Sequence, residues 1–136
     1  KGKWDSYTQV NRWTKKETKN QARFSGTAGN EISFTFDGTG VSIVGNWLKD
    51  GGKADVYVDG IFKRTIDCYF NFSDQEHYNM NLYHIINLPQ GKHNVKMIVK
   101  GEKRPESQGT NVYITEAVIF KTSDKNNENY RFSFQK

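Results

Sequence analysis

The sequence predicts an all-β protein, an antiparallel β-sandwich of the jelly-roll type with roughly eight to ten strands. Apolar and polar residues alternate along most of the chain, and helical periodicity is nearly absent. Glycines number 12 and prolines only 2, which is typical of ordered elements separated by turns. Aromatic residues make up 14% of the 136, far too many for a disordered chain. The chain is therefore expected to fold around a single core.

The alternation places the strands one after another along the chain. Residues 7–13 are a candidate first strand. In the next, Ile32, Phe34 and Phe36 alternate with polar residues, as a half-buried strand requires. Further strands are predicted within residues 41–43, 54–58, 62–69, 82–88, 95–100, 112–120 and 130–134.

The connections between these strands fall into two classes. Residues 37–40, the Asp59-Gly60 pair and residues 89–91 form tight turns, and Asp-Gly is the signal of a type I′ hairpin. Residues 46–53, 70–80 and 101–110 form long loops. Because consecutive strands run antiparallel, we expect the tight turns at one end of the sandwich and the long loops at the other. Residues 24–30 should reach the long-loop end.

The positive charge is concentrated at the N-terminus. The formal net charge is +5, and residues 1–30 alone carry that excess, with seven Lys and Arg against two Asp and Glu. The body of the domain is then neutral, without the basic stripe that a nucleic-acid-binding face needs. We expect a basic segment with a first strand over residues 1–22 and a single β-sandwich domain over residues 23–136. No apolar run is long enough for a transmembrane helix.

The long loops have the composition of a sugar site. Aromatic rings stack on the C–H face of a pyranose, while amide, carboxylate and guanidinium groups bind its hydroxyls. The candidate binding residues are Asn46, Trp47, Asp50, Phe72, Glu76, His77, Tyr78, Arg104 and Gln108. Alternatively, Trp47 and Phe70 or Phe72 close the end of the sandwich as core residues. Arg104 and Lys49 could equally bind a carboxylate, which would make the ligand a uronic-acid sugar.

Enzyme signatures are largely missing. No Gly-x-Ser-x-Gly elbow, phosphate-binding loop or His-Glu-x-x-His motif occurs. His77 beside Glu76 could transfer protons, but no nucleophile accompanies this pair. Asp50, Asp74 and Glu76 could supply a glycosidase carboxylate pair, but such sites usually need a larger scaffold around a multi-sugar cleft. The single cysteine, Cys68, excludes an internal disulfide and a cysteine-based zinc site. A non-catalytic protein is predicted.

Several segments carry a resemblance to a known family. These segments are residues 34–41, 54–60, 65–69, 88–93, 107–109 and 112–114. They resemble galactose-binding-like β-sandwich modules, the jelly rolls appended as carbohydrate-binding units to secreted glycan-degrading enzymes. The resemblance covers roughly residues 23–120 and rests on strands and tight turns that are specific for this fold.

The resemblance implies a glycan ligand bound at the long-loop end, with a catalytic domain of the same parent protein as a partner. It also implies an extracellular, periplasmic or cell-surface location. Many relatives hold a structural calcium ion, but no ligand set for one can be matched in this sequence. The alternative is a structural or protein-interaction accessory domain of a larger enzyme, in which the loop aromatics form a contact patch.

Overall fold

The computed structural model describes residues 2–10, 17–70, 77–122 and 127–133. Ten strands occur in this part of the chain, with no helix among them. They are β1 (Asp5–Val10), β2 (Glu17–Ser25), β3 (Glu31–Gly38), β4 (Gly40–Trp47), β5 (Lys53–Val58), β6 (Ile61–Asp67), β7 (His77–Ile85), β8 (Gly91–Val99), β9 (Val112–Thr122) and β10 (Asn127–Ser133). None of the described residues belongs to a helix that could cross a membrane.

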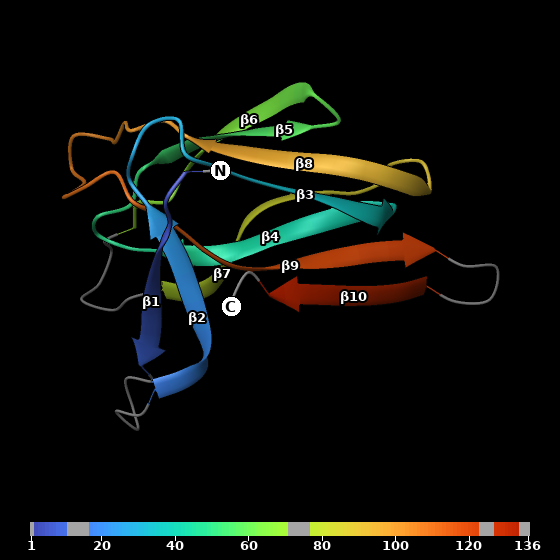
Figure 1. Ribbon diagram of the computed structural model, residues 1–136, viewed down its shortest axis with the longest axis horizontal. Coiled ribbons are helices and arrows are strands. Elements are labelled where there is room, and N and C mark those ends of the chain that lie inside the picture. The colour runs from blue at the N-terminus through green and yellow to red at the C-terminus, as the bar shows by residue number, and fades with distance from the viewer. Residues whose placement is uncertain (1, 11–16, 71–76, 123–126, 134–136) are drawn as a thin grey trace.

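Two antiparallel sheets face each other. The six-stranded sheet has the order β1-β2-β9-β4-β7, with β10 also paired to β9, and the four-stranded sheet has the order β3-β8-β5-β6. Figure 1 shows them as a lower and an upper layer. The alternating apolar residues meet between the layers, because every second side chain of a strand points to the same face. Ile43 of β4, Val56 of β5 and Met97 of β8 are all at most 1% exposed.

The strand pairing is nested. Strand β5 pairs with β6, β4 with β7, β3 with β8 and β2 with β9, all antiparallel. A long hairpin folded over on itself in this way is the jelly-roll arrangement. The predicted antiparallel jelly-roll sandwich is therefore confirmed.

The predicted turn geometry is present at one end. Asp59 and Gly60 have φ of 53° and 79°, the positive values that a type I′ turn requires at both central residues. At the opposite end the long loops meet. Isolated parallel bridges join Leu48 to Tyr69 and Gly51 to Asn111. The Thr110 hydroxyl donates to the Gly26 carbonyl oxygen over 2.9 Å, which brings residues 24–30 to that end as well.

Two of these loops are shorter than predicted. Strand β4 continues through Trp47, and β7 already begins at His77, where the two residues pair. The predicted loops 46–53 and 70–80 therefore each included strand residues. Register shifts beside Val44 and Gly45 interrupt the regular alternation in this stretch, which is why the pattern concealed the ends of the strands.

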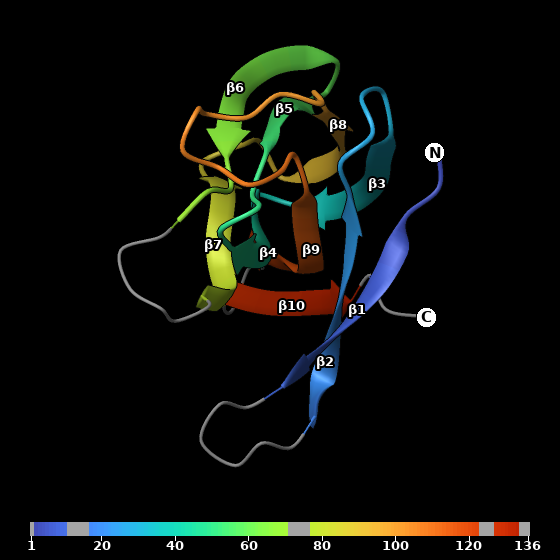
Figure 2. The ribbon, with the colours of Figure 1, turned by 90° about the vertical axis from the view of Figure 1, so that its left-hand side faces the viewer.

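The N-terminal strands form a hairpin that leaves the body of the sandwich. Strand β1 pairs only with β2 among the described residues, and β2 contacts β9 only over Arg23, Phe24 and Ser25. Figure 2 shows the hairpin extending past β10 on one side of the molecule. The first strand thus lies in the predicted basic segment 1–22, whose end falls inside β2.

Candidate functional site

A groove of about 410 Å³ lies on one side of the sandwich, between strands β6 and β7. These are the edge strands of the four-stranded and six-stranded sheets, and Figure 2 shows them one above the other. The sheets are not joined here, so side chains of both strands reach the opening. The lining residues are Trp47, Arg64, Thr65, Ile66, Asp67, Asn81, Leu82, Tyr83 and His84.

Trp47 stands at the end of the groove nearest the long loops, because it is the last residue of β4. Its side chain is half-buried. Its ring centroid lies 5.7 Å from that of Phe70, with 33° between the ring planes. Trp47 therefore packs against Phe70 and also lines the groove.

The β7 wall is polar and ordered. The Ser42 hydroxyl donates to Asn81 Oδ1 over 2.6 Å, and Asn81 Nδ2 lies 2.9 Å from His84 Nδ1. Burial raises the pKa of the neighbouring Tyr83 phenol, and the positive charge of Arg64 opposes part of this shift. The arrangement places one chain of hydrogen bonds and one aromatic ring along the same wall.

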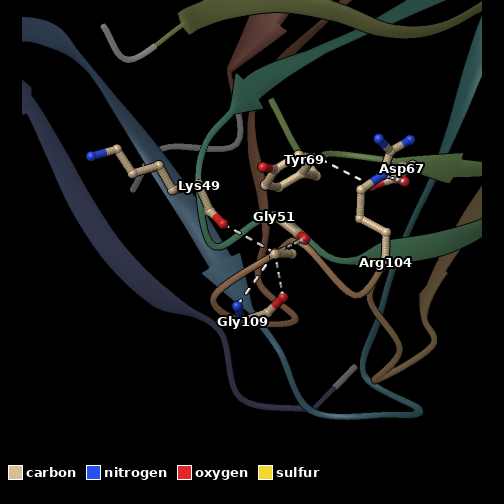
Figure 3. A network of polar contacts seen from close by, with 7 residues as sticks. Lys49, Gly51, Asp67, Tyr69, Arg104 and Gly109 are labelled. Carbon is tan, nitrogen blue, oxygen red and sulfur yellow. Dashed lines mark hydrogen bonds and ion pairs between the residues drawn. The ribbon is translucent and has the colours of Figure 1, made fainter. Parts of the chain in front are cut away.

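The β6 wall holds one carboxylate that is already engaged. Asp67 Oδ2 accepts from Arg104 Nε over 2.9 Å, and Asp67 Oδ1 accepts from the Tyr69 backbone N–H over 3.0 Å. The Arg104 guanidinium lies 5.3 Å from the centroid of the Tyr69 ring. Figure 3 shows Arg104 together with Asp67 and Tyr69. The hydrogen bond and the charge of Asp67 raise the pKa of Arg104. Arg104 thus fixes the loop 101–110 against the end of β6.

The long-loop end itself is closed by internal hydrogen bonds. Asp50 Oδ2 accepts from Asn111 Nδ2 over 2.8 Å and from the Tyr113 hydroxyl over 2.9 Å. The buried Ser107 hydroxyl lies 2.7 to 3.1 Å from the carbonyl oxygens of Gly51, Gly109 and Lys49. Figure 3 shows Lys49 and Gly51 on one loop and Gly109 on the other, close to one another. These loops are therefore held to each other by their own polar groups.

The predicted site residues are placed in different surroundings. Asn46 has 0% of its surface exposed, because the register shift beside Gly45 turns consecutive residues inward, so its amide does not reach the surface. Asp50 is partly buried and directed toward Asn111 and Tyr113. Trp47 lines the groove, Arg104 lies beside it, and Gln108 is exposed on the loop.

Four other predicted residues are not placed. Phe72 and Glu76 lie outside the described residues, and His77 and Tyr78 lie in β7 with side chains outside the described part. In contrast, Arg64, Asn81, Tyr83 and His84 line the groove and were missed by the sequence reasoning. They belong to strands rather than loops, and no local pattern reveals that those strands are edges.

No three His, Cys, Asp or Glu side chains gather as a metal site within the described ranges. The residues described thus provide no acidic cluster that fits the calcium ion implied by the resemblance. The three carbonyl oxygens that converge at the long-loop end already surround the Ser107 hydroxyl. Calcium binding stays a prediction.

Two solved structures align with this chain. A Paenibacillus xanthan lyase aligns with a TM-score of 0.53 and 11% identity, over 90% of this chain and 13% of the lyase. The likeness confirms the β-sandwich fold. The CBM36-1 domain of a multidomain xylanase from the hindgut metagenome of Trinervitermes trinervoides aligns with a TM-score of 0.46 and 17% identity, over 83% of this chain and 82% of that domain. No family model and no curated protein matches the sequence.

Proposed function

We propose that the chain is a non-catalytic carbohydrate-binding module that holds a glycan in the groove between β6 and β7. The observation that carries the proposal is the composition of this groove. The groove has a volume of about 410 Å³. Its lining includes the rings of Trp47 and Tyr83 and the polar side chains of Arg64, Asn81 and His84. Rings that offer an apolar face, next to groups that donate and accept hydrogen bonds, match the two surfaces of a sugar.

Binding would be an equilibrium process in which no bond is broken. The groove follows two strands on the side of the sandwich, a shape that suits a section of a glycan chain. An open, hydrated site of this kind gives affinities on the order of micromolar to millimolar, about −8 to −4 kcal/mol. The long-loop end, where the sequence placed the ligand, contributes through Trp47 and positions Asp67 through Arg104.

We also propose that the module is part of a larger secreted enzyme and works outside the cell, in the periplasm or on the cell surface. The similar segment makes up 13% of a xanthan lyase, which supports an accessory role beside a catalytic domain. The resemblance of the turn and strand segments to galactose-binding-like modules supports the same role.

The test is a glycan-array screen of the 136-residue chain, with calcium and with a chelator, followed by titration of the best ligand. Trp47→Ala should lose at least tenfold in affinity, since an aromatic platform is worth about 1.4 kcal/mol or more. Phe62→Ala is the matched control, because Phe62 is 52% exposed and does not line the groove. Unfolding midpoints of both variants show whether Trp47 acts through the fold. Unchanged affinity in a folded Trp47→Ala would contradict the proposal.

A second function is favoured by one observation at the opposite end. Ile61, Phe62 and Ile86 are 59%, 52% and 56% exposed, near the tight turns. Such apolar exposure fits contact with another domain of the parent protein. A blank array from a folded sample would favour this protein-interaction role.

A further inference from the structure

We propose that the groove selects a glycan that bears a carboxylate, a uronic-acid sugar, with Arg64 binding the carboxylate and His84 donating a second hydrogen bond. This inference rests on the proposed function and names the class of ligand for the same site. It follows from which polar groups of the groove are already engaged and which are still available.

Arg64 contributes a positive charge to the groove. It pairs with Val56 across strands β5 and β6, so both side chains leave the sheet on the same face. Val56 is 0% exposed in the core, whereas Arg64 stands on the edge strand and is exposed. No carboxylate of the described residues forms an ion pair with its guanidinium. A groove wall with such a charge favours an anion.

Asp67, the one carboxylate among the groove-lining residues that the structure describes, does not form an ion pair with Arg64. Asp67 uses Oδ2 to accept from Arg104 and Oδ1 to accept from the Tyr69 backbone N–H. Arg104 is not itself a lining residue, so the charge of Asp67 is balanced from outside the groove. Among the described lining residues, Arg64 is then the one charged side chain without an ion-pair partner.

The hydrogen-bond chain on β7 indicates which nitrogen of a neutral His84 ring carries the proton. Asn81 Oδ1 accepts from the Ser42 hydroxyl, so the group 2.9 Å from His84 Nδ1 is the amide nitrogen of Asn81. That nitrogen can only donate, and His84 Nδ1 must accept. The neutral ring then carries its proton on Nε2, which makes Nε2 a donor. His84, on the β7 side of the groove, can therefore donate a hydrogen bond through Nε2.

Arg64 on the β6 side of the groove and His84 Nε2 on the β7 side can thus both donate to a ligand. A planar guanidinium matches a carboxylate with two parallel hydrogen bonds, and an imidazole N–H can bind a further oxygen. The C–H face of the same sugar would pack on Trp47, which lines the groove from β4. A neutral glycan would engage the ring but would leave the Arg64 charge without a partner.

The experiment compares two oligosaccharides of the same length and linkage, one built of glucuronic acid and the other its carboxyl-reduced glucose counterpart. Calorimetric titration should give at least tenfold tighter binding of the uronate, and the preference should shrink at high salt. In Arg64→Gln the two ligands should bind equally. Lys63→Gln is the matched control, because Lys63 is the neighbouring exposed cation on β6 and does not line the groove.

His84→Ala should weaken uronate binding by a smaller factor than Arg64→Gln, about threefold to tenfold. Arg64→Lys keeps the charge without the planar fork and should fall between wild type and Arg64→Gln. Equal binding of the two oligosaccharides by the wild type, or an unchanged preference in Arg64→Gln, would overturn the inference and leave glycan binding intact. Stronger binding of a sulfated oligosaccharide would overturn the carboxylate assignment. Binding of no glycan would overturn the proposed function as well.

Discussion

His93 Nδ1 lies 2.7 Å from Asp59 Oδ2, while Nε2 of the same ring lies 2.6 Å from the carbonyl oxygen of Pro89. Both ring nitrogens thus face acceptors, and both bonds are made only when each nitrogen carries a proton. Asp59 Oδ1 also accepts from the Asn94 backbone N–H over 2.8 Å. The pair therefore fastens the type I′ turn of β5 and β6 to strand β8 and to the connection before it.

This contact predicts how stability changes with pH. The hydrogen bond to Asp59 raises the pKa of His93 above its ordinary 6.5, and the same bond lowers the pKa of Asp59 below 3.8. The His93 contribution is fully present below about pH 6.5 and disappears as the pH rises through the higher folded pKa. The Asp59 contribution is present above about pH 3.8 and disappears as the pH falls through the lower folded pKa. The unfolding free energy should include the full contribution only between these limits.

Urea unfolding from about pH 5 to pH 9 measures this dependence. We expect His93→Gln to lose about 1 to 2 kcal/mol at the acid end, a modest figure because the Asp59 side chain is 42% exposed. The difference from wild type should shrink toward pH 9. Thr35→Ala, at an exposed threonine of β3 that does not titrate, serves as the control and should keep the wild-type slope. Parallel curves for wild type and His93→Gln would exclude a charged His93.

Asp50 should contribute to the stability of the folded protein. Its Oδ2 accepts from Asn111 Nδ2 and from the Tyr113 hydroxyl, so Asp50→Ala leaves two donors without their acceptor. We expect a loss of about 1 to 3 kcal/mol in unfolding free energy. Tyr113→Phe removes one donor and should cost about 1 kcal/mol. A stable Asp50→Ala protein with lost glycan affinity would instead support the binding role that the sequence suggested.

Ser107 should be equally important for the long-loop end. Ser107 is only 5% exposed. Its hydroxyl lies near the carbonyl oxygens of Lys49, Gly51 and Gly109. The Gly109 backbone N–H donates to this hydroxyl over 3.3 Å. Ser107→Ala should lower the unfolding free energy by about 1 to 3 kcal/mol. Ser33→Ala, at an exposed serine of β3, should change it by less than about 0.5 kcal/mol. Equal midpoints for the two variants would show that the loops are joined by other contacts.

The thiol of Cys68 should be unreactive in the folded protein. Burial raises the pKa of its thiol to about 12, and the residue is 0% exposed. Since the thiolate is the reactive species, a thiol reagent at neutral pH should label the native chain very slowly and the urea-unfolded chain completely. Fast labelling under native conditions would mean that this part of the core opens readily.

Much of the fold could be predicted from local patterns. The alternation of Ile32, Phe34 and Phe36 marks a strand, and Asp59-Gly60 dictates a type I′ turn because both residues tolerate positive φ. The contrast between tight turns and long loops places the loops at one end, where Leu48 meets Tyr69. The register shift beside Gly45 could not be predicted, because an extra residue in a strand does not change the local composition.

The candidate site was predicted only in part. Trp47 was identified because aromatic residues beside polar ones in a long loop are typical of a sugar site. Asn46 has the same local pattern yet is fully buried, and burial depends on neighbours from β7 and β9. Arg64 was not identified, because a charged residue in an alternating strand ordinarily faces solvent. His84 was interpreted as structural, because it lies in the middle of a strand.

The sequence by itself determined the strands, the turns and the end at which the loops gather, because φ preferences and side-chain alternation act between neighbouring residues. The tertiary structure alone decided that β6 and β7 are the edges of different sheets and that a groove opens between them. It also decided that Asp67 is engaged by Arg104 while Arg64 has no carboxylate partner among the described residues. Such relationships depend on contacts between residues distant in sequence, which form only when the two sheets pack together.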